Sequence, residues 1–185
     1  EIEPEINLRV KWNPFELNPS LPKKGMDRAD YLRIKFGSTS TAKKIYRQIL
    51  INAEADELEL NLEAIKKVPN TRDAHKLILS ANSPKLQNLI VSKLFEAYFI
   101  LGVDIGEANN LLDIAAKSGL QRSEAENILI DPELNSRVEA LEEQVSDLGI
   151  MGVPAFLYNG HYLFSGAQST ETIRLSIIKA HKRHL

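Results

Sequence analysis

The sequence predicts an α/β protein in which a long helical segment separates two strand-forming ends. Near the N-terminus, apolar and polar residues alternate over positions 6–13, a period typical of a half-buried strand. Near the C-terminus, Asn159-Gly160 lies between two apolar runs, which predicts a β-hairpin with a type I′ turn. Between these ends, apolar residues recur at helical spacing. We therefore expect the order strand, loop, about six helices, hairpin, helix.

Apart from the helix predicted over Glu107–Ser118, each predicted helix begins at a residue whose side chain can accept a hydrogen bond from the first-turn amides. These N-caps are Asp27, the Ser/Thr cluster at residues 38–41, Asn70-Thr71, Ser83 before Pro84, Ser123 with its capping-box partner Glu126, Asp131 before Pro132, and Ser169 or Gln168. Glycines mark several of the predicted helix ends, namely Gly37, Gly102, Gly119 and Gly149.

Composition excludes several classes of function. The 185 residues are 43% hydrophobic and 26% charged, with a formal net charge of −2. No basic block favours nucleic acid or an anionic membrane surface, and no apolar run approaches the roughly 20 residues that span a bilayer. The acidic residues 1–5 lack the basic and apolar parts of a signal peptide. We therefore expect no nucleic-acid partner and no membrane partner.

The sequence contains no cysteine, so disulfides, thiolate nucleophiles and cysteine metal sites are excluded within these residues. None of the four histidines is spaced like a metal ligand. No Ser-His-Asp arrangement, phosphate-binding loop or glycine-rich nucleotide motif is present. We therefore expect no metal site and no catalytic residue within these 185 positions.

Val153-Pro154 opens the first strand of the predicted hairpin. Proline cannot donate a ladder hydrogen bond, so Pro154 must lie at the start of its strand or on a sheet edge. Proline also reduces the preference for a trans peptide bond to roughly 0.5–1 kcal/mol. The Val153–Pro154 bond is therefore a candidate cis peptide.

The hairpin segment, from Gly152-Val153-Pro154 to Ser165-Gly166-Ala167-Gln168, resembles the cis-proline loop and closing ββα element of DsbA-like proteins of the thioredoxin superfamily. Other segments resemble the FrnE branch of that family, which lies near 2-hydroxychromene-2-carboxylate isomerases and kappa-class glutathione transferases. These segments are Trp12-x-Pro14-Phe15-Glu16-Leu17-Asn18-Pro19, Gly25-Met26-Asp27-Arg28, Lys35-Phe36-Gly37, Pro69-Asn70-Thr71-x-Asp73-Ala74-His75, Leu94-Phe95-x-Ala97-Tyr98-Phe99 and Asp104-Ile105-Gly106.

The resemblance implies a thioredoxin-like α/β fold with a large all-helical insertion. The thioredoxin-like domain would comprise residues 1–24 and 150–185, and the insertion would comprise residues 25–149. FrnE-like proteins begin with a strand and a helix that carries Cys-x-x-Cys, and this sequence starts where that helix would end. We therefore expect a preceding strand and helix. Without that central strand, the unpaired backbone groups of the neighbouring strands would each cost roughly 1–3 kcal/mol.

The resemblance also assigns the candidate site. Gly152, Val153 and Pro154 would bind substrate, facing a thiolate at a helix N-terminus where the helix dipole lowers its pKa. Residues that could line the same site are Asn70, His75, Gly166, Ala167 and Gln168. Simpler roles remain open for these five residues: Asn70 as a helix cap, His75 as a packed side chain, and residues 166–168 as a capped helix start.

The implied function is that of a DsbA/FrnE-like protein thiol–disulfide oxidoreductase, which acts through a Cys-x-x-Cys outside these residues on protein or small-thiol disulfides. It would bind no cofactor. One alternative is a glutathione-dependent isomerase or transferase of the 2-hydroxychromene-2-carboxylate isomerase type; in such relatives, residues equivalent to Ala167 and Gln168 tend to be acidic or carry a hydroxyl. Another is a cysteine-free binding remnant. The family branch implies a cytoplasmic location, and a homodimer is compatible with it.

Overall fold

The computed structural model describes residues 6–183 of the chain. The acidic residues 1–5 and residues 184–185 lie outside the described residues. The elements are, in order, β1 (Met26–Asp27), α1 (Arg28–Phe36), α2 (Thr39–Ala55), β2 (Lys67–Val68), α3 (Arg72–Ser80), α4 (Pro84–Phe95), the π-helix η1 (Glu96–Ile100), α5 (Ala108–Lys117), α6 (Arg122–Ile130), α7 (Pro132–Asp147), β3 (Ala155–Tyr158), β4 (His161–Ser165) and α8 (Thr170–Arg183).

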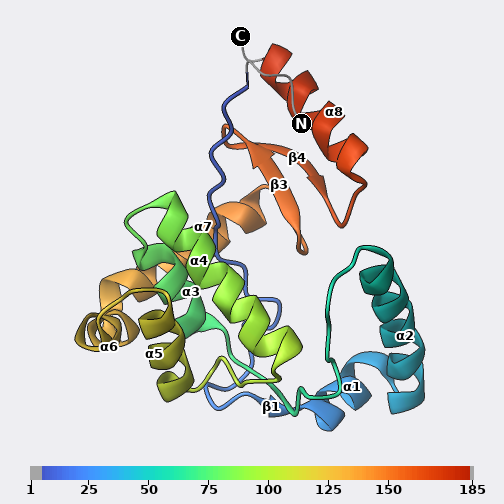
Figure 1. The fold of residues 1–185 in the computed structure, drawn as a ribbon, viewed down its shortest axis with the longest axis vertical. Coiled ribbons are helices and arrows are strands. Elements are labelled where there is room, and N and C mark those ends of the chain that lie inside the picture. Colours follow the sequence, from blue (N-terminus) through green and yellow to red (C-terminus); the bar gives the residue numbers. More distant parts are fainter. Residues whose placement is uncertain (1–5, 184–185) are drawn as a thin grey trace.

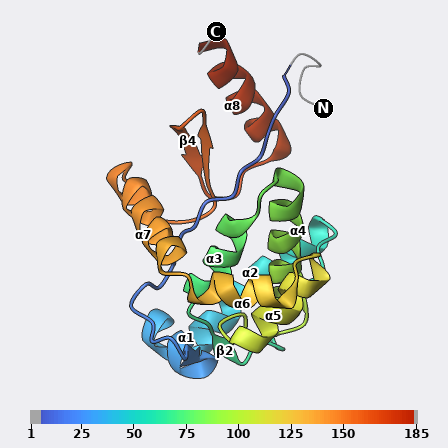
Figure 2. The same ribbon diagram turned by 90° about the vertical axis from the view of Figure 1, so that its left-hand side faces the viewer.

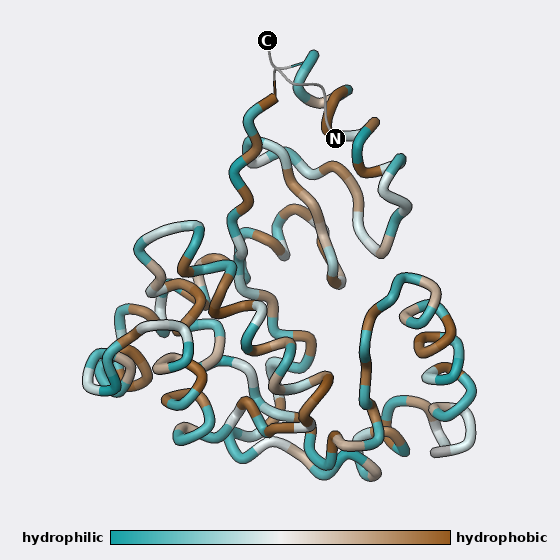
Figure 3. The backbone as a smooth tube through the Cα atoms, viewed as in Figure 1, coloured by the Kyte–Doolittle hydropathy of each residue, from teal (hydrophilic) through white to brown (hydrophobic). Residues whose placement is uncertain are grey.

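Helices α3 to α7 form a helical block, with the α1–α2 pair on one side of it and the β3–β4 hairpin with α8 above it (Figure 1). Hydrophobic and hydrophilic residues alternate along the helices, as amphipathic helices require (Figure 3). The core of the block includes Leu77, Ile90, Leu111 and Val138, whose side chains are fully buried. Within residues 6–183, no helix combines the length and the apolar character needed to cross a membrane.

Residues 6–13 do not form a strand, so the prediction from their alternating pattern is wrong. They run extended beside the hairpin on their way to the helical block (Figures 1 and 2). Leu8 and Val10 are 39% and 55% exposed. Alternation specifies an extended chain with one apolar face, but a strand also needs a partner for its backbone groups. Among the described residues, β3 pairs only with β4, so residues 6–13 lie beside the hairpin without joining its sheet.

Most of the predicted helix boundaries are confirmed. The side chain of Asp27 accepts hydrogen bonds from two first-turn amides of α1, and that helix ends at Gly37, whose φ is 74°. The side chain of Asp131 likewise accepts from two first-turn amides of α7, which has Pro132 at its first position. These caps succeed as predictions because donor and acceptor are two or three residues apart, so no distant contact decides them.

The capping box predicted at Ser123 and Glu126 is wrong. Helix α6 already begins at Arg122, and its N-cap Gln121 makes no side-chain cap hydrogen bond. Ser123 therefore lies inside the first turn, where its hydroxyl is not placed to cap that turn.

The helix predicted to run from Pro84 to the glycine at 102 changes form before its end. Helix α4 passes into the π-helix η1, and the Phe99 carbonyl accepts a hydrogen bond from the Asn61 amide at 2.8 Å. Gly102 then ends the segment with φ at 68°, and a Cβ there would lie 2.5 Å from the Ala64 backbone. Glycine is required at position 102 because any side chain would collide with that neighbouring loop.

A short pair of strands that the sequence did not predict joins α1 to the start of α3. In this antiparallel pair, Met26 lies opposite Val68 and Asp27 opposite Lys67. Strands of two residues leave no periodic signal in the sequence.

Candidate functional site

Gly152, Val153 and Pro154 form the turn that leads into β3. The peptide bond between Val153 and Pro154 is cis, as expected from the sequence. Pro154 immediately precedes β3, so its lack of an amide proton costs the ladder no hydrogen bond. Its carbonyl accepts a hydrogen bond from the Gly166 amide at 2.7 Å. This bond joins the turn to the segment that follows β4.

The predicted hairpin is confirmed. Asn159 and Gly160 have φ values of 49° and 82°, the positive values that a type I′ turn requires. The strands are antiparallel, and the Phe156 and Phe164 rings stack with their centroids 4.7 Å apart. The hairpin therefore holds residues 152–154 at one end and the Asn159–Gly160 turn at the other.

Helix α8 packs on this hairpin and fixes it from one side. The Tyr158 hydroxyl and the His181 Nδ1 atom lie 2.8 Å apart within hydrogen-bond distance. The Ser169 hydroxyl accepts from the Thr172 amide at 3.2 Å, so Ser169 caps the first turn of α8. The sequence allowed Ser169 or Gln168 in this role, and the structure selects Ser169.

The loop before β3 is anchored at its start and exposed beyond it. Ile150 is 5% exposed, and its amide donates to the Val145 carbonyl at 3.2 Å. Met151 and Val153, by contrast, are 91% and 48% exposed. The turn thus presents two apolar side chains to solvent from a backbone held at both ends.

Asn70 anchors a loop to the start of α3. Its side-chain amide donates to the Leu21 carbonyl at 3.0 Å, and its side-chain oxygen accepts from the Arg72 amide at 3.1 Å. Thr71 is the N-cap residue but makes no side-chain cap hydrogen bond. Both polar groups of Asn70 are therefore engaged in holding residues 21 and 72 together.

His75 is partly buried, and both of its ring nitrogens are buried without a hydrogen bond, although the Phe15 backbone lies near the ring. Burial lowers the pKa of His75 to about 4, and the positive charge of Arg72 acts in the same direction. The ring is therefore neutral at neutral pH. His75 lies on α3, near the Phe15 backbone and Arg72.

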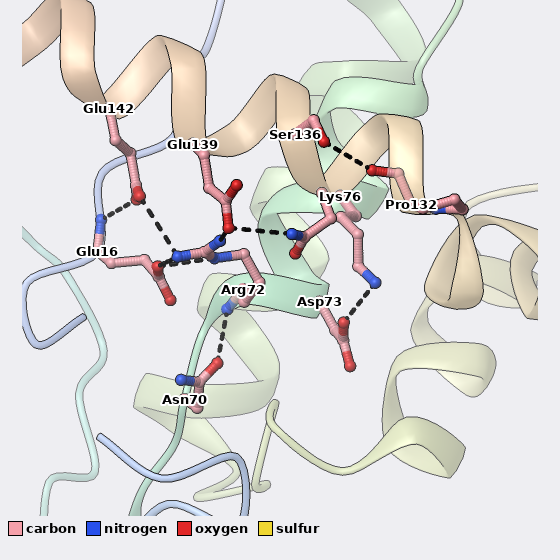
Figure 4. A network of polar contacts seen from close by, with 10 residues as sticks. Glu16, Asn70, Arg72, Asp73, Lys76, Pro132, Ser136, Glu139 and Glu142 are labelled. Carbon is pink, nitrogen blue, oxygen red and sulfur yellow. Dashed lines mark hydrogen bonds and ion pairs between the residues drawn. The ribbon is translucent and has the colours of Figure 1, made fainter. Parts of the chain in front are cut away.

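A network of one arginine and three carboxylates lies at the start of α3 (Figure 4). The Arg72 Nε atom donates to Glu16 Oε2 at 2.8 Å, and its Nη1 atom donates to Glu139 Oε1 at 2.8 Å. The Glu16 side chain is only 2% exposed. Glu142 accepts from the Glu16 amide at 2.7 Å, and burial raises the pKa of its carboxyl. The network joins residues 14–18 to both α3 and α7.

Lys76 makes a second buried contact in the same region. Its ammonium group lies 2.7 Å from Asp73 and also donates to the Leu129 carbonyl near the end of α6. The Lys76 side chain is 6% exposed. Because a cation near a helix C-terminus is favourable, Lys76 stabilises the packing of α3 on α6.

Gln87 of α4 holds the backbone of Trp12. Its side-chain oxygen accepts from the Trp12 amide at 2.9 Å, and its side-chain amide donates to the Trp12 carbonyl at 3.2 Å. The indole Nε1 atom of Trp12 donates to Asn88. Gln87 thus gives one residue of the extended segment the two hydrogen bonds that a neighbouring strand would supply.

The predicted site residues fall into two groups. In the first group, Pro154 of the Gly152–Pro154 turn is hydrogen-bonded to Gly166, and Ala167 and Gln168 follow Gly166 as exposed residues. Among residues 6–183, the hydrogen bonds recorded for Asn70 run to Leu21 and Arg72, and none joins it or His75 to the turn.

Sequence reasoning missed the contacts of Arg72 and Gln87. Arg72 occupies the unspecified position of Pro69-Asn70-Thr71-x-Asp73, and its partner Glu16 is 56 residues away. Gln87 is followed by a second polar residue, Asn88, so nothing in the sequence marked it, and only the structure shows that Gln87 is buried.

The described residues contain no group of three or more His, Cys, Asp or Glu side chains that could hold a metal ion. A shallow hollow of about 700 Å³ lies over α6, and its lining includes no residue of the hairpin.

The chain matches the model of one protein family and is similar to several solved structures. The model of the DSBA-like thioredoxin domain family matches residues 2–177. A probable DsbA oxidoreductase from Streptomyces coelicolor has 24% identity and a TM-score of 0.78, over 91% of this chain and 73% of that one. A protein assigned as a protein disulfide isomerase from Nitrosomonas europaea has 14% identity and a TM-score of 0.69, over 84% and 89%.

A third similar structure is a 2-hydroxychromene-2-carboxylate isomerase, with 15% identity and a TM-score of 0.62, over 87% of this chain and 78% of that one. No match was found among curated proteins. The three structural similarities support the thioredoxin-like α/β fold with mostly helical content, and the family match covers nearly the whole chain.

Proposed function

This chain belongs to the DSBA-like thioredoxin domain family. We therefore propose that it is part of a protein thiol–disulfide oxidoreductase of the DsbA/FrnE type. The family and its structural neighbours support an oxidoreductase- or isomerase-like enzyme. The substrates would be protein or small-thiol disulfides, without a bound cofactor. The chain has no cysteine, so the reacting pair would come from a segment outside these 185 residues.

The observation that carries this proposal is the position of the Val153–Pro154 turn at the open end of β3. The turn is held by Ile150 on one side and by the Pro154–Gly166 hydrogen bond on the other. Among the described residues, β3 pairs only with β4, so its second edge can receive an extended chain. Residues 6–13 run extended beside the same hairpin (Figure 1).

In the proposed mechanism, this chain supplies recognition rather than the reacting sulfur. A substrate would lie extended along the Val153 backbone, with apolar contact to the half-exposed Val153 side chain. A thiolate from the cysteine pair would attack one sulfur of the substrate disulfide, releasing the other as a thiolate. The second cysteine would then attack the mixed disulfide, leaving the pair oxidised and the substrate reduced; the reverse sequence would form a disulfide in the substrate.

The direct test is the reduction of insulin by dithiothreitol, followed as precipitation of the insulin B chain. The product of the complete reading frame should accelerate precipitation, whereas these 185 residues alone should not. The matched control replaces the first cysteine of that product with serine, which should abolish the acceleration. A reading frame that encodes no cysteine pair, or a product without effect, contradicts the proposal.

Recognition can be tested on the 185 residues directly. We expect them to bind reduced, carboxymethylated lactalbumin, an unfolded polypeptide without free thiols. Val153→Asp should weaken binding about tenfold, because it places a charge where an apolar contact is expected. Leu175→Asp on α8 is the matched control, since Leu175 is 51% exposed against 48% for Val153. Equal effects of the two changes would show that the turn has no special role.

The similarity to a 2-hydroxychromene-2-carboxylate isomerase keeps a glutathione-dependent isomerase or transferase as a second proposal. That chemistry would need a serine in place of the first cysteine. Ala167 and Gln168 lack the acid or hydroxyl that such relatives tend to carry there, and Ser169 already caps α8. These features favour disulfide exchange. A cysteine-free binding remnant would bind lactalbumin but fail the insulin test. A cytoplasmic location and a homodimer likewise remain proposals.

A further inference from the structure

We propose that Met151 is a reversible oxidation site through which peroxides control recognition at the adjoining Gly152–Pro154 turn. The effect on recognition rests on the proposed function of that turn. The oxidation site itself does not.

Exposure separates the two methionines of this chain. Met151 is 91% exposed, the highest value among the exposed large hydrophobic side chains of the described residues. Met26 is partly buried and lies in β1, opposite Val68. The sequence has two methionines and no cysteine, so the thioether of Met151 is the most accessible sulfur for an oxidant.

The backbone directly before Met151 is held by two hydrogen bonds. Gly149 ends α7 with φ at 70°, and its amide donates to the Ser146 carbonyl at 2.8 Å. The next residue, Ile150, is buried and hydrogen-bonded to Val145. Met151 thus directly follows a buried, hydrogen-bonded residue.

Met151 also lies where an entering chain would meet it. It is two residues before Val153, and both side chains are exposed on a segment held at Ile150 and at Pro154. A methionine side chain is flexible and polarizable, so it can adapt to apolar partners of different shapes. The Met151–Val153 pair therefore forms an apolar contact surface suited to an extended, unfolded polypeptide.

The oxidation step is balanced with hydrogen peroxide as the oxidant. A lone pair of the Met151 sulfur attacks one peroxide oxygen, the O–O bond breaks, and a sulfur–oxygen bond forms while water leaves. The sulfur loses two electrons and the peroxide gains them. In the reverse step, a methionine sulfoxide reductase returns the thioether, the oxygen leaves as water, and a dithiol is oxidised to a disulfide.

The sulfoxide is polar and accepts hydrogen bonds from water, so covering it with an apolar side chain removes hydration without replacing it. We expect oxidation to weaken binding of an unfolded polypeptide at the turn about tenfold. Reduction of the sulfoxide should restore binding. The chain would then bind its substrate less well under peroxide than under reducing conditions.

The first test measures the chemistry alone. The 185-residue protein is treated with hydrogen peroxide, and the peptides that contain Met151 and Met26 are followed by mass spectrometry. We expect Met151 to gain one oxygen atom at least about tenfold faster than Met26, in line with its greater exposure. Methionine sulfoxide reductase with dithiothreitol should remove it. Equal rates, or a Met151 sulfoxide that the reductase does not repair, would overturn the oxidation site.

The second test measures recognition with reduced, carboxymethylated lactalbumin as the probe. Peroxide should weaken binding by the unaltered protein and by Met26→Leu, and the reductase should restore it. Binding by Met151→Leu should not respond to peroxide, because that variant lacks the sulfur. Met151→Gln should imitate the sulfoxide. Leu175→Gln on α8 should not weaken binding, although it also places an amide at an exposed apolar position (Leu175 is 51% exposed, Met151 91%). A peroxide response that persists in Met151→Leu contradicts the proposal.

The two tests distinguish failure of this inference from failure of the proposed function. If the untreated protein does not bind lactalbumin, the proposed recognition function fails, and the control of recognition fails with it. The rate comparison still decides whether Met151 is an oxidation site. If the untreated protein binds and its Met151 sulfoxide form binds equally well, recognition at the turn stands and its control by Met151 is refuted.

Discussion

Arg72 at the start of α3 binds the buried carboxylate of Glu16 through its Nε atom at 2.8 Å. The two residues are 56 positions apart in the chain, and the Glu16 side chain is 2% exposed. Through Glu139 and Glu142, the same arginine also reaches α7. This contact fastens the segment after Pro14 to the helical block that faces the hairpin.

Replacing this arginine should destabilise the protein strongly. Arg72→Ala leaves the Glu16 carboxylate buried without its cation, and we expect the free energy of unfolding to fall by about 3 kcal/mol. Urea denaturation at neutral pH measures the change. The control is Arg122→Ala: Arg122 is half exposed and pairs with Asp113 and Glu126 on the surface, so its loss should cost less than about 1 kcal/mol. Similar losses for both variants would contradict a special role for Arg72.

Removing the side-chain amide of Gln87 should release Trp12. Gln87→Leu leaves the Trp12 backbone groups and the Ile78 carbonyl without their partner, which we expect to cost about 1–3 kcal/mol. Trp12 is the one tryptophan in the sequence, so fluorescence reports on it alone. Acrylamide should quench it more strongly in the variant. Asn88→Ala removes only the indole contact and should leave stability closer to that of the unaltered protein; the reverse order would refute the assignment.

The two predicted caps provide a matched pair. Asp131→Ala removes the acceptor for two first-turn amides of α7, and we expect stability to fall by about 1 kcal/mol. Ser123→Ala should change stability by no more than about 0.5 kcal/mol, because Ser123 makes no cap hydrogen bond. Thermal or urea denaturation of both variants decides the comparison, and a larger cost at Ser123 would argue against the observed start of α6.

His75 should make the protein less stable in mild acid. Its pKa is lowered to about 4 in the folded state, mainly by burial, whereas an unfolded histidine titrates near its ordinary value of 6.5. Between these values the unfolded chain binds more protons, so stability falls as pH decreases from 6.5 towards 4. The full effect is at most about 3 kcal/mol. Glu142 acts in the opposite direction, because burial raises the pKa of its carboxyl and protonation then favours the folded state.

Urea denaturation at a series of pH values checks this dependence. His75→Leu should show a smaller loss of stability between pH 6.5 and 4 than the unaltered protein, and the two curves should run parallel above pH 7, where the imidazole is neutral in both states. Identical slopes in the acid range would show that His75 does not contribute.

Much of the fold and part of the site could be predicted from local sequence. The caps at Asp27 and Asp131 and the turn at Asn159-Gly160 each depend on residues within a few positions of one another. Ser123 shows the limit of that reasoning, since a capping box also requires the helix to begin at that residue. Position 72 carried no local signal, because its role depends on a carboxylate that only folding brings near.

The sequence by itself determined the amphipathic helices, most of their ends, the hairpin turn and the absence of any thiol among these residues. These follow from backbone preferences and from side chains that act on neighbouring amides. The tertiary structure decided that residues 6–13 remain without a strand partner, that the ring nitrogens of His75 are buried, and that Met151 stays exposed beside the turn. Strand pairing and burial depend on which surfaces from distant parts of the chain meet. The same pattern of apolar and polar residues is compatible with several ways of packing these surfaces.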